Sequence, residues 1–411
     1  MADVATRTIL SFDRGSSSLK VAVYDVGVAH ERQTLSGGVE ALGGRDATLR
    51  MRDCRETPVR EECRLLGDAS PVAALLARVH QLGVQVDAVG HRLVFGGLAH
   101  ESPTRVTAEL MTSLDAQVPF DPLHTPDALA AIREIAAVSP ELPQVVCFDT
   151  AFHRRMPMVA QRLPIPRELW SEGVRRYGFH GLSYESIVRG LGVAGTRGKM
   201  IVAHLGSGAS VAAMRDGRPV DTSMGFSPLG GLMMGTRPGD LDPGALLYLL
   251  RTHRYSVEEL DEVLTRRSGL LGVSGTSADM RELLERRATD AAAAEAVELF
   301  VYQAKKNIGA FVAVLDGLDT LVFTGGIGER AAAVRWEIAQ GLLHLGVEID
   351  PARNAASATI ISAEGASVVV RVVAAQENLM VARHTYTTLF ASAEMNSADI
   401  SCPPREAEAK A

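Results

Sequence analysis

Short strand-like apolar runs alternate with longer alanine- and leucine-rich stretches along most of the chain. The apolar runs are "QVDAVGHRLVF", "LPQVVCFDT", "KMIVAHLG", "DTLVFTGG" and "ASVVVRVVAA", and the helix-like stretches are 126–138, 291–315 and 331–345. This alternation predicts a layered α/β fold. At 411 residues, the chain has room for two domains or for one large α/β unit with an ample core.

Composition removes several classes of protein. The formal net charge of −7 argues against a general nucleic-acid or anionic-membrane binder, although it leaves room for a local basic site. The four cysteines form no CxxC pair, which is typical of reduced thiols in a cytoplasmic protein. No 18-residue apolar segment is present. We therefore expect a soluble cytoplasmic protein without a membrane or nucleic-acid partner.

The stretch "SFDRGSSSLKVAV" interrupts an apolar run at Asp13 and resumes one after Lys20. Because the turn leads into a second strand, it cannot be a Walker-type loop, which leads into a helix. Backbone and hydroxyl donors of the turn at 15–18 could face an anion, with Lys20 adding a positive charge. Asp13 is placed to hold a cation. A plain serine-rich hairpin is the alternative that this stretch leaves open.

The same pattern returns later in the chain. "GSSSLKVAV" at 15–23 aligns without gaps with "GSGASVAAM" at 206–214, and an apolar run precedes each. Both predict a strand, a turn of small residues and a second strand. If the match is not a coincidence, the fold is duplicated, with two similar lobes that each contribute a phosphate-facing hairpin.

A second glycine loop follows the run "DTLVFTGGIGE". It predicts a strand ending near Thr324 and a helix beginning near Glu329, with backbone amides suited to a nucleotide. Read as GxGxxA from Gly326 to Ala331, with Glu348 further on, it also fits a dinucleotide fingerprint. A dinucleotide oxidoreductase is therefore a second hypothesis, although the motif stands late in the chain.

Several polar residues stand at predicted strand ends or in loops, where α/β proteins build their sites. Each of them taken alone is more often structural than catalytic. These residues are Arg92, Asp149, His153, His180 and Arg237. Taken together, the chain offers two arginines, a histidine, an aspartate, a lysine and two glycine loops. Phosphoryl transfer needs such a set, because fixed cations must hold the charge of the moving group.

The order and spacing of eight stretches now indicate a family. They are "GSSSLK", "GHRLVFGG", "FDTAFH", "YGFHGLS", "AHLGSGAS", "TSMGFSPLGGLMMGTRPGDLDP", "SGLLGVSG" and "FTGGIGE". From about Thr8 to His384, the chain resembles the acetate and propionate kinase family. The resemblance implies a two-lobed fold of the sugar kinase, Hsp70 and actin type, with a duplicated ribonuclease-H-like core. It implies an N-terminal lobe at 1–155, a C-terminal lobe at 156–378, a helix returning to the first lobe at 379–392 and a disordered tail at 393–411.

The resemblance also implies an activity. The chain would transfer the γ-phosphoryl group of ATP reversibly to acetate or propionate by direct in-line attack, with Mg²⁺ or Mn²⁺, as a homodimer formed through the second lobe. Alternatives within the family are a preference for propionate or butyrate and pyrophosphate as donor. Alternatives from other classes are a nucleotide-binding sensor or chaperone-like module, a sugar kinase and the dinucleotide oxidoreductase.

Roles of single residues follow from the same resemblance. Asp149 orients the reacting groups, His180 and Arg237 hold the transferring phosphoryl group, and Arg92 grips the substrate carboxylate. The wall around the acyl group is formed by Val94, Leu123, Phe179 and Pro228. Phosphates face Lys20, His204, Leu205, Gly206, Ser207 and Gly208, while the adenosine lies among Asp279, Met280, Arg281, Gly326, Ile327, Gly328, Glu329 and Arg330. The metal ligands are Asp13 and Glu377.

The chain departs from the family pattern at several of these motifs. The departing residues are Asp13, Arg14, Phe95, Leu182, Tyr184, Ser207, Met280 and Arg330. The implied cations and acidic residues are all retained, so the sequence predicts that phosphoryl transfer is intact. Substrate choice and nucleotide preference stay open.

Overall fold

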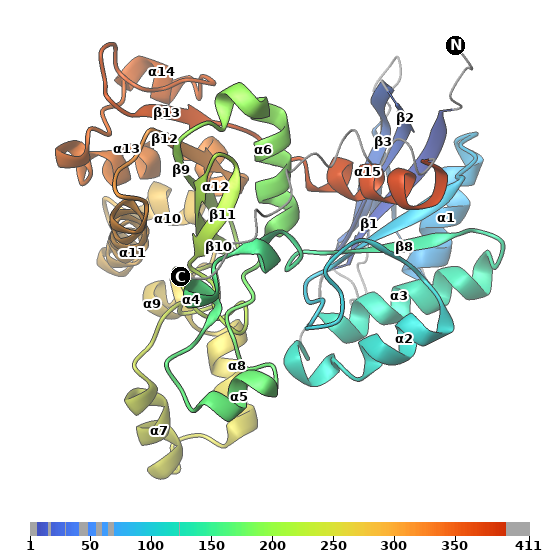
Figure 1. The fold of residues 1–411 in the computed structure, drawn as a ribbon, viewed down its shortest axis with the longest axis horizontal. Helices are drawn as coiled ribbons and strands as arrows, with labels where there is room; N and C mark the ends of the chain where they lie inside the picture. Colours follow the sequence, from blue (N-terminus) through green and yellow to red (C-terminus); the bar gives the residue numbers. More distant parts are fainter. Residues whose placement is uncertain are drawn as a thin grey trace, which may run out of the picture. The chain divides into compact units, whose positions relative to one another are not determined.

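The computed structural model describes residues 6–14, 18–28, 30–40, 48–54, 60–64, 70–122 and 124–391. These residues form two compact units (Figure 1). The first takes in the described residues of Met1–Leu93, Ser102–Cys147 and Asn378–Ala411, and the second consists of Val94–Glu101 and Phe148–Glu377. Residues 15–17 of the predicted hairpin turn, the predicted wall residue Leu123 and the predicted tail at 393–411 lie outside the described residues.

The first unit is built on a mixed eight-stranded sheet in the order β5-β4-β3-β2-β1-β6-β8-β7. Neighbouring strands from β1 to β5 pair antiparallel, whereas β6 pairs parallel with β1. The strands are β1 (Arg7–Arg14), β2 (Ser18–Gly27), β3 (His30–Glu40), β4 (Thr48–Asp53), β5 (Arg60–Arg64), β6 (Ala88–Leu93), β7 (Thr104–Arg105) and β8 (Gln144–Phe148). The helices are α1 (Pro71–Gln81), α2 (Ala108–Asp115), η1 (Val118–Phe120), α3 (Thr125–Val138) and α15 (Glu377–Phe390).

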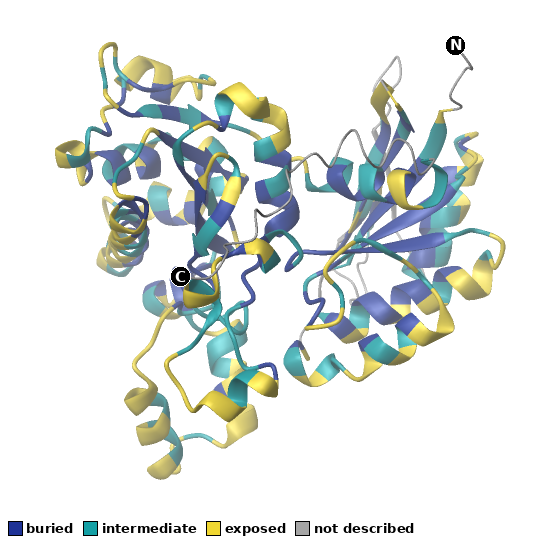
Figure 2. Ribbon diagram, viewed as in Figure 1, coloured by how far each residue is buried: buried dark blue, intermediate teal, exposed yellow. Residues whose placement is uncertain are grey.

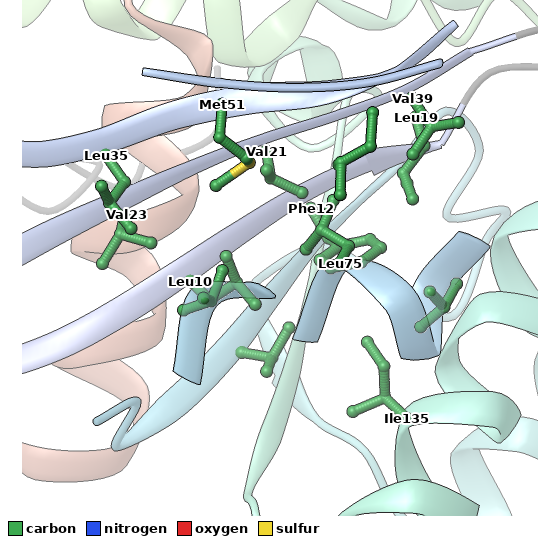
Figure 3. Close-up of a cluster of buried hydrophobic side chains, with 14 of the residues drawn as sticks. Leu10, Phe12, Leu19, Val21, Val23, Leu35, Val39, Met51, Leu75 and Ile135 are labelled. Atoms are coloured by element: carbon green, nitrogen blue, oxygen red, sulfur yellow. The ribbon is translucent and has the colours of Figure 1, made fainter. Parts of the chain in front are cut away.

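Alternation along β1 and β2 divides this unit into layers. Successive side chains of a strand point to opposite faces of the sheet. Leu10 and Phe12 therefore enter a core with Leu75 of α1 and Ile135 of α3, a cluster drawn in Figure 3. The preceding residue Ile9 faces the other way, into a cluster with residues of α15. The sheet is thus covered by helices on both faces, as the alternation of the sequence predicts.

The second unit is built on a five-stranded sheet in the order β11-β10-β9-β12-β13. Its strands are β9 (Lys199–Leu205), β10 (Ala209–Arg215), β11 (Arg218–Thr222), β12 (Thr320–Thr324) and β13 (Val369–Val372). Its helices are η2 (Phe152–Arg155), α4 (Met158–Gln161), α5 (Arg167–Ser171), α6 (Gly181–Gly195), α7 (Pro243–Arg251), α8 (Val257–Arg266), α9 (Gly269–Ser274), α10 (Met280–Arg286), α11 (Ala291–Leu315), α12 (Gly325–Arg330), α13 (Ala332–Gln340), η3 (Leu343–Leu345) and α14 (Pro351–Ala355).

Helices cover this second sheet as well. Tyr184 and Ile187 of α6 pack against Val202 of β9 and Val322 of β12. The long helix α11, which coincides with the predicted helical stretch 291–315, contacts β9, β10 and β11. Figure 2 shows the strands buried and the outer sides of the helices exposed. The sheet therefore provides a rigid support from which strand ends and loops can present functional side chains.

The two sheets share one topology. In each, three antiparallel strands (β1–β3 and β9–β11) are followed by a strand that pairs parallel with the first of them, β6 with β1 and β12 with β9. The strands β2 and β10 occupy equivalent positions in the two sheets, and they carry most of the two stretches that align in the sequence. The shared topology supports a duplicated fold, which is what the internal match predicts.

Segment 28–66, to which the sequence pattern assigns no element, contributes three antiparallel strands of the first unit. Leu35 and Val39 of β3, with Leu49 and Met51 of β4, are buried in the core of Figure 3. The intervening residues include charged and glycine positions, which hide the alternation in the sequence. Within the described residues, no helix is long and apolar enough to cross a bilayer.

We predict an acid-sensitive step in the stability of the first unit, at His91 of β6. The ring is buried and its Nε2 lies 2.7 Å from Oε1 of Gln144, and burial lowers the pKa of His91 to about 4. Between pH 6.5 and 4, the unfolded chain binds a proton that the folded chain does not. The free energy of unfolding therefore falls as the pH is lowered through this range. The loss for one such histidine is about 2 kcal/mol at pH 5.

Melting temperatures at pH 7.5 and 5.0 measure this effect. His91→Gln should lose less of its melting temperature than the parent protein over the same interval. Equal losses in both proteins would contradict the prediction.

Candidate active site

The hairpin between β9 and β10 is the centre of the candidate site. Its turn is closed by a hydrogen bond from the Gly206 amide to the Gly208 carbonyl, at 3.0 Å. A Cβ placed on Gly208 would lie 2.9 Å from Nη2 of Arg237 and 3.0 Å from Nε2 of His180. The structure therefore brings two of the predicted phosphoryl-binding side chains together on one backbone position. Two nitrogen donors that converge on a glycine turn are suited to an anion.

His180 precedes α6 in a left-handed backbone conformation, with φ of 57°. The amide of Gly181 donates to the carbonyl of Asp149 at 2.9 Å, and a Cβ on Gly181 would lie 2.1 Å from that oxygen. This close approach holds the start of α6 against the loop that follows β8. Non-glycine residues with strained backbone angles cluster at functional sites. Asp149 therefore contacts, through its carbonyl, the residue that follows His180, and both Asp149 and His180 are predicted catalytic residues.

Three hydroxyl residues support the two histidines of this site. The rings of His180 and His204 stack with centroids 4.3 Å apart. Ser183 Oγ lies 2.8 Å from Nδ1 of His204, and Ser210 Oγ lies 2.9 Å from Nδ1 of His180 and also bonds Tyr184 OH. The sequence analysis assigned Ser183 and Ser210 no role. Their spacing is the signal that could have found them, because Ser183 is one helical turn after His180 and Ser210 follows the hairpin glycine by two residues.

Arg237 lies in the long loop between β11 and α7. Its Nη1 donates to the carbonyl of Pro228 at 2.8 Å. The same loop is tied to the hairpin because the amide of Gly235 donates to the carbonyl of Ser207 at 2.9 Å. A predicted wall residue, Pro228, is therefore in direct contact with a predicted phosphoryl-binding residue.

The second glycine loop differs from its predicted form. The helix α12 begins at Gly325, not near Glu329, so the glycines themselves form its first turn. A residue of the helix itself stabilises this first turn, because Oε1 of Glu329 accepts a hydrogen bond from the amide of Gly325 at 3.1 Å. The same oxygen accepts a hydrogen bond from the amide of Ala375, also at 3.1 Å. Glu329, predicted to line the adenosine site, thus joins the start of its own helix to the segment after β13.

A fully buried arginine holds the other end of α12. Arg335 donates from Nη1 to the carbonyls of Gly328 and Glu329, both at 2.9 Å, and from Nε to Oδ1 of Asn354 at 2.8 Å. Carbonyls at the end of a helix lack partners within the helix, so this cation satisfies two of them. The sequence analysis did not single out Arg335, whose apolar-looking surroundings give no sign of these long-range bonds.

Of the remaining predicted nucleotide residues, Gly326 lies next to the hairpin. A Cβ on Gly206 would lie 3.7 Å from the amide nitrogen of Gly326, so the hairpin and the second glycine loop are neighbours. Asp279 caps α10, and its hydrogen bonds with the Arg281 side chain hold the pKa of the carboxyl below its usual range. Met280 is buried. Ile327 is half-buried and Arg330 is exposed.

Three predicted residues belong to the first unit. Nη1 of Arg92, at the end of β6, donates to Oδ2 of Asp13 at 3.2 Å, and both side chains are mostly buried. Lys20 of β2 is exposed and pairs across the hairpin with Asp13. A predicted substrate-binding cation and a predicted metal ligand are therefore partners in one ion pair.

Asp13 and Glu377 are the side chains that the sequence predicts as ligands of a divalent cation. Mg²⁺ takes oxygen ligands and keeps several waters, so one or two carboxylates suffice. The carboxylates of Asp13 and Glu377 fit that requirement by their chemistry. Among the residues that the structure describes, no group of three or more His, Cys, Asp or Glu side chains could hold a metal ion.

Comparison with known proteins identifies the family of this chain. A model of the acetokinase family matches residues 8–383. The chain belongs to the acetokinase family. An acetate kinase of Rhodopseudomonas palustris is 43% identical over 402 residues, which cover 94% of this chain and 98% of the relative. An acetate kinase of Streptomyces coelicolor is 39% identical over 405 residues, covering 95% and 98%.

Solved structures of this family have the same fold. A propionate kinase from Francisella tularensis superposes with a TM-score of 0.86 at 34% identity, covering 93% of this chain and 99% of that one. An acetate kinase from Porphyromonas gingivalis gives 0.81 at 33% identity, with coverage of 93% and 100%. The predicted family and fold class are confirmed. So is the prediction that the chain is an enzyme, a kinase of the acetokinase family.

We predict that Gly208→Ala lowers kinase activity by about 10² to 10³, the effect of losing one aligned oxyanion donor. The added methyl group would meet Nη2 of Arg237 and Nε2 of His180, which must move. Gly190→Ala is the matched control, because no atom lies within 4 Å of its Cβ position. Rates of ADP formation and melting temperatures of both variants measure the effect. Equal activity in the two variants would contradict the prediction.

Proposed function

We propose that the chain transfers the γ-phosphoryl group of ATP reversibly to acetate or propionate, giving an acyl phosphate and ADP by direct in-line attack. The observation that carries this proposal is the convergence of Arg237 Nη2 and His180 Nε2 beside Gly208. Membership of the acetokinase family supports the substrates. Two fixed nitrogen donors beside a glycine hairpin are what a transferring phosphoryl group requires.

The acceptor needs no general base. A carboxylic acid with a pKa near that of a Glu side chain, about 4.3, is already ionised at neutral pH. Asp149 is therefore proposed to orient the reacting groups rather than to remove a proton. Its backbone contact with Gly181 supports this role, since it couples Asp149 to the position of His180.

Arg92 is proposed to hold the acceptor carboxylate. A guanidinium matches a carboxylate with two parallel hydrogen bonds, which an ammonium group cannot do. The ion pair with Asp13 supports this role, because it holds the guanidinium in place at the end of β6. In this arrangement Asp13 also reduces the net positive charge that the acceptor meets.

Arg237 and His180 are proposed to hold oxygens of the phosphoryl group as it moves. Lys20 and the hairpin His204–Gly208 would face the nucleotide phosphates. The stretches 279–281 and 326–330 would enclose the adenosine. The short separation between Gly206 and Gly326 supports this division, because it puts a phosphate turn next to a nucleotide loop.

Asp13 and Glu377 are the residues proposed to hold Mg²⁺, directly or through water. A bound Mg²⁺ would neutralise charge on the β- and γ-phosphates. Asp13 then serves two partners, the metal and Arg92, and its replacement separates the two effects. Mn²⁺ shares the preference for oxygen ligands, so it is proposed as a substitute.

The acyl group is proposed to lie against Val94, Phe179 and Pro228, together with Leu123. One methylene group in an apolar pocket changes discrimination by about 1–3 kcal/mol, so these side chains do not decide between acetate and propionate. The likeness to a propionate kinase from Francisella tularensis keeps propionate as an equal candidate.

The cell compartment and the oligomeric state of the enzyme are also proposed. The formal net charge of −7 and the absence of CxxC pairs support a cytoplasmic enzyme without nucleic-acid or membrane partners. A homodimer through the second unit is supported by α7, which has no buried residue and exposes Leu247 and Tyr248. An apolar helix face of this kind is typical of an interface.

A hydroxamate assay for acyl phosphate tests the activity. The enzyme is incubated with ATP and Mg²⁺ and with formate, acetate, propionate or butyrate in turn. We expect product with acetate or propionate. No product with any acid would overturn the proposal, and turnover with pyrophosphate in place of ATP would revise the donor.

We predict that Arg237→Ala lowers kcat by about 10² to 10⁵, the range for a lost oxyanion donor or arginine finger. The guanidinium is proposed to hold charge that develops during transfer, so kcat falls more than KM rises. Initial rates over a range of ATP and acetate concentrations measure both constants. A variant within about threefold of the parent protein would remove Arg237 from the mechanism.

For Arg92→Ala we predict a higher KM for the carboxylate and a lower kcat. An unchanged KM in Arg92→Ala would argue against the substrate role.

For Asp13→Asn we predict a lower KM for the carboxylate, because the amide oxygen can still accept a hydrogen bond from Arg92 while the competing negative charge is gone. We expect the carboxylate KM of Asp13→Asn to fall by about fivefold, the effect of a partly exposed ion pair worth about 1 kcal/mol. In Asp13→Asn, a higher Mg²⁺ requirement at constant carboxylate KM would instead favour the metal role alone.

A further inference from the structure

A chain of three hydrogen-bonding groups runs from α6 to the core of the second unit. Nδ1 of His180 lies 2.9 Å from Oγ of Ser210, and the same oxygen makes a short hydrogen bond with the hydroxyl of Tyr184. His180 and Tyr184 are one turn apart at the start of α6, and Ser210 faces them from β10. Tyr184 and Ser210 are fully buried. Water therefore does not compete for these bonds.

The proton of the Tyr184 hydroxyl has one acceptor among the described residues. The rings nearest to Tyr184 are Phe152 and His153, with centroids 6.1 and 5.5 Å away. His153 is bonded through Nε2 to the carbonyl of Phe179, and its Nδ1 makes no hydrogen bond within the described part of the chain. Burial raises the pKa of Tyr184 above its ordinary value, so the phenol keeps its proton. Ser210 Oγ is what remains to accept it.

The acceptor of the Tyr184 proton decides which group donates in the hydrogen bond between Ser210 and His180. A serine oxygen can accept two hydrogen bonds, but if Tyr184 donates to Ser210, the Ser210 hydrogen has only Nδ1 of His180 as an acceptor among the hydrogen bonds of the described residues. That nitrogen is then an acceptor. In the reverse direction, Nδ1–H of His180 would donate to Ser210 and the serine would donate to the phenol oxygen. The phenol hydrogen would then be buried without an acceptor, at a cost of about 1–3 kcal/mol. The first direction is favoured.

We propose that Tyr184 is a positioning residue which, acting through Ser210, keeps His180 in the tautomer that carries its proton on Nε2. That nitrogen is the one beside Gly208 and Arg237. The arrangement also disfavours a doubly protonated ring, because Nδ1–H would again need Ser210 as acceptor. The catalytic consequence rests on the proposed function: the histidine offers a permanent N–H donor to a phosphoryl oxygen without a preceding change of protonation.

The tautomer is measured directly by two-bond ¹H–¹⁵N correlation spectra of the full chain labelled with ¹⁵N-histidine. A spectrum of His180→Gln identifies the signals of that ring. In the parent protein at neutral pH, we expect the pattern of a neutral ring protonated at Nε2. A ring protonated at Nδ1, or at both nitrogens, would overturn the proposal without any variant of Tyr184.

Tyr184→Phe removes the phenol proton donor and keeps the ring. Ser210 is then free to accept from His180, so we expect the spectrum to show a share of Nδ1–H or of the doubly protonated ring. We expect kcat for acyl phosphate formation to fall by about tenfold to a hundredfold, less than for deleting a donor outright, with KM for both substrates nearly unchanged. An unchanged His180 spectrum in the folded variant would refute the role of Tyr184.

Tyr177→Phe is the matched control. Tyr177 is a buried tyrosine of the same unit whose hydroxyl donates to the carbonyl of Gly173 at 2.8 Å, away from His180. Its loss should lower the melting temperature as much as Tyr184→Phe while leaving the His180 spectrum and kcat unchanged. If the parent protein shows the expected tautomer, and Tyr184→Phe alters it, but no acyl phosphate forms, the proposed function fails and the hydrogen-bonded chain stands.

Discussion

The turn between β9 and β10 has no side chain at Gly208, and this leaves room for the two nitrogen donors that lie beside it. At Gly208 the space that a Cβ would occupy is bounded by the guanidinium of Arg237 and the imidazole of His180. One hydrogen bond holds each of these groups in place. Nη1 of Arg237 donates to the carbonyl of Pro228, and Nδ1 of His180 bonds Oγ of Ser210. The antiparallel pairing of β9 with β10 fixes the turn between them. The backbone of the hairpin and one hydrogen bond to each donor side chain therefore set the positions of Arg237 and His180.

Local sequence patterns predicted the parts of the fold that carry strong periodicity. The stretch 291–315 is α11, and most of the two aligned stretches lies in β2 and β10, which occupy equivalent positions in two sheets of one topology. The strands within 28–66 escaped notice for a physical reason. In β3 and β4 the buried residues, such as Leu35 and Met51, alternate with charged residues and glycines, and the partners that make these strands stable lie elsewhere in the chain.

The candidate site shows the same limit of sequence reasoning. Residues that belong to a recognisable motif, such as His180, His204 and Arg237, were found because motif order can be read without coordinates. Contacts between distant segments were not predicted, whether they involve a predicted residue, such as Glu329, or one that was not singled out, such as Arg335. Glu329 bonds the amide of Ala375, which is 46 residues away, and Arg335 bonds Asn354. Neither contact has a local signature, since both depend on how distant segments pack.

Tyr184 shows why a departure from a family motif need not disturb its chemistry. A buried hydroxyl that must give up its proton imposes a direction on every hydrogen bond beyond it. In this chain the direction passes through Ser210 to Nδ1 of His180 and leaves the opposite nitrogen as the donor. What the position beside Ser210 must supply is therefore a proton, and more than one type of side chain can supply it. The motif is better described by the number and direction of its protons than by the identity of its residues.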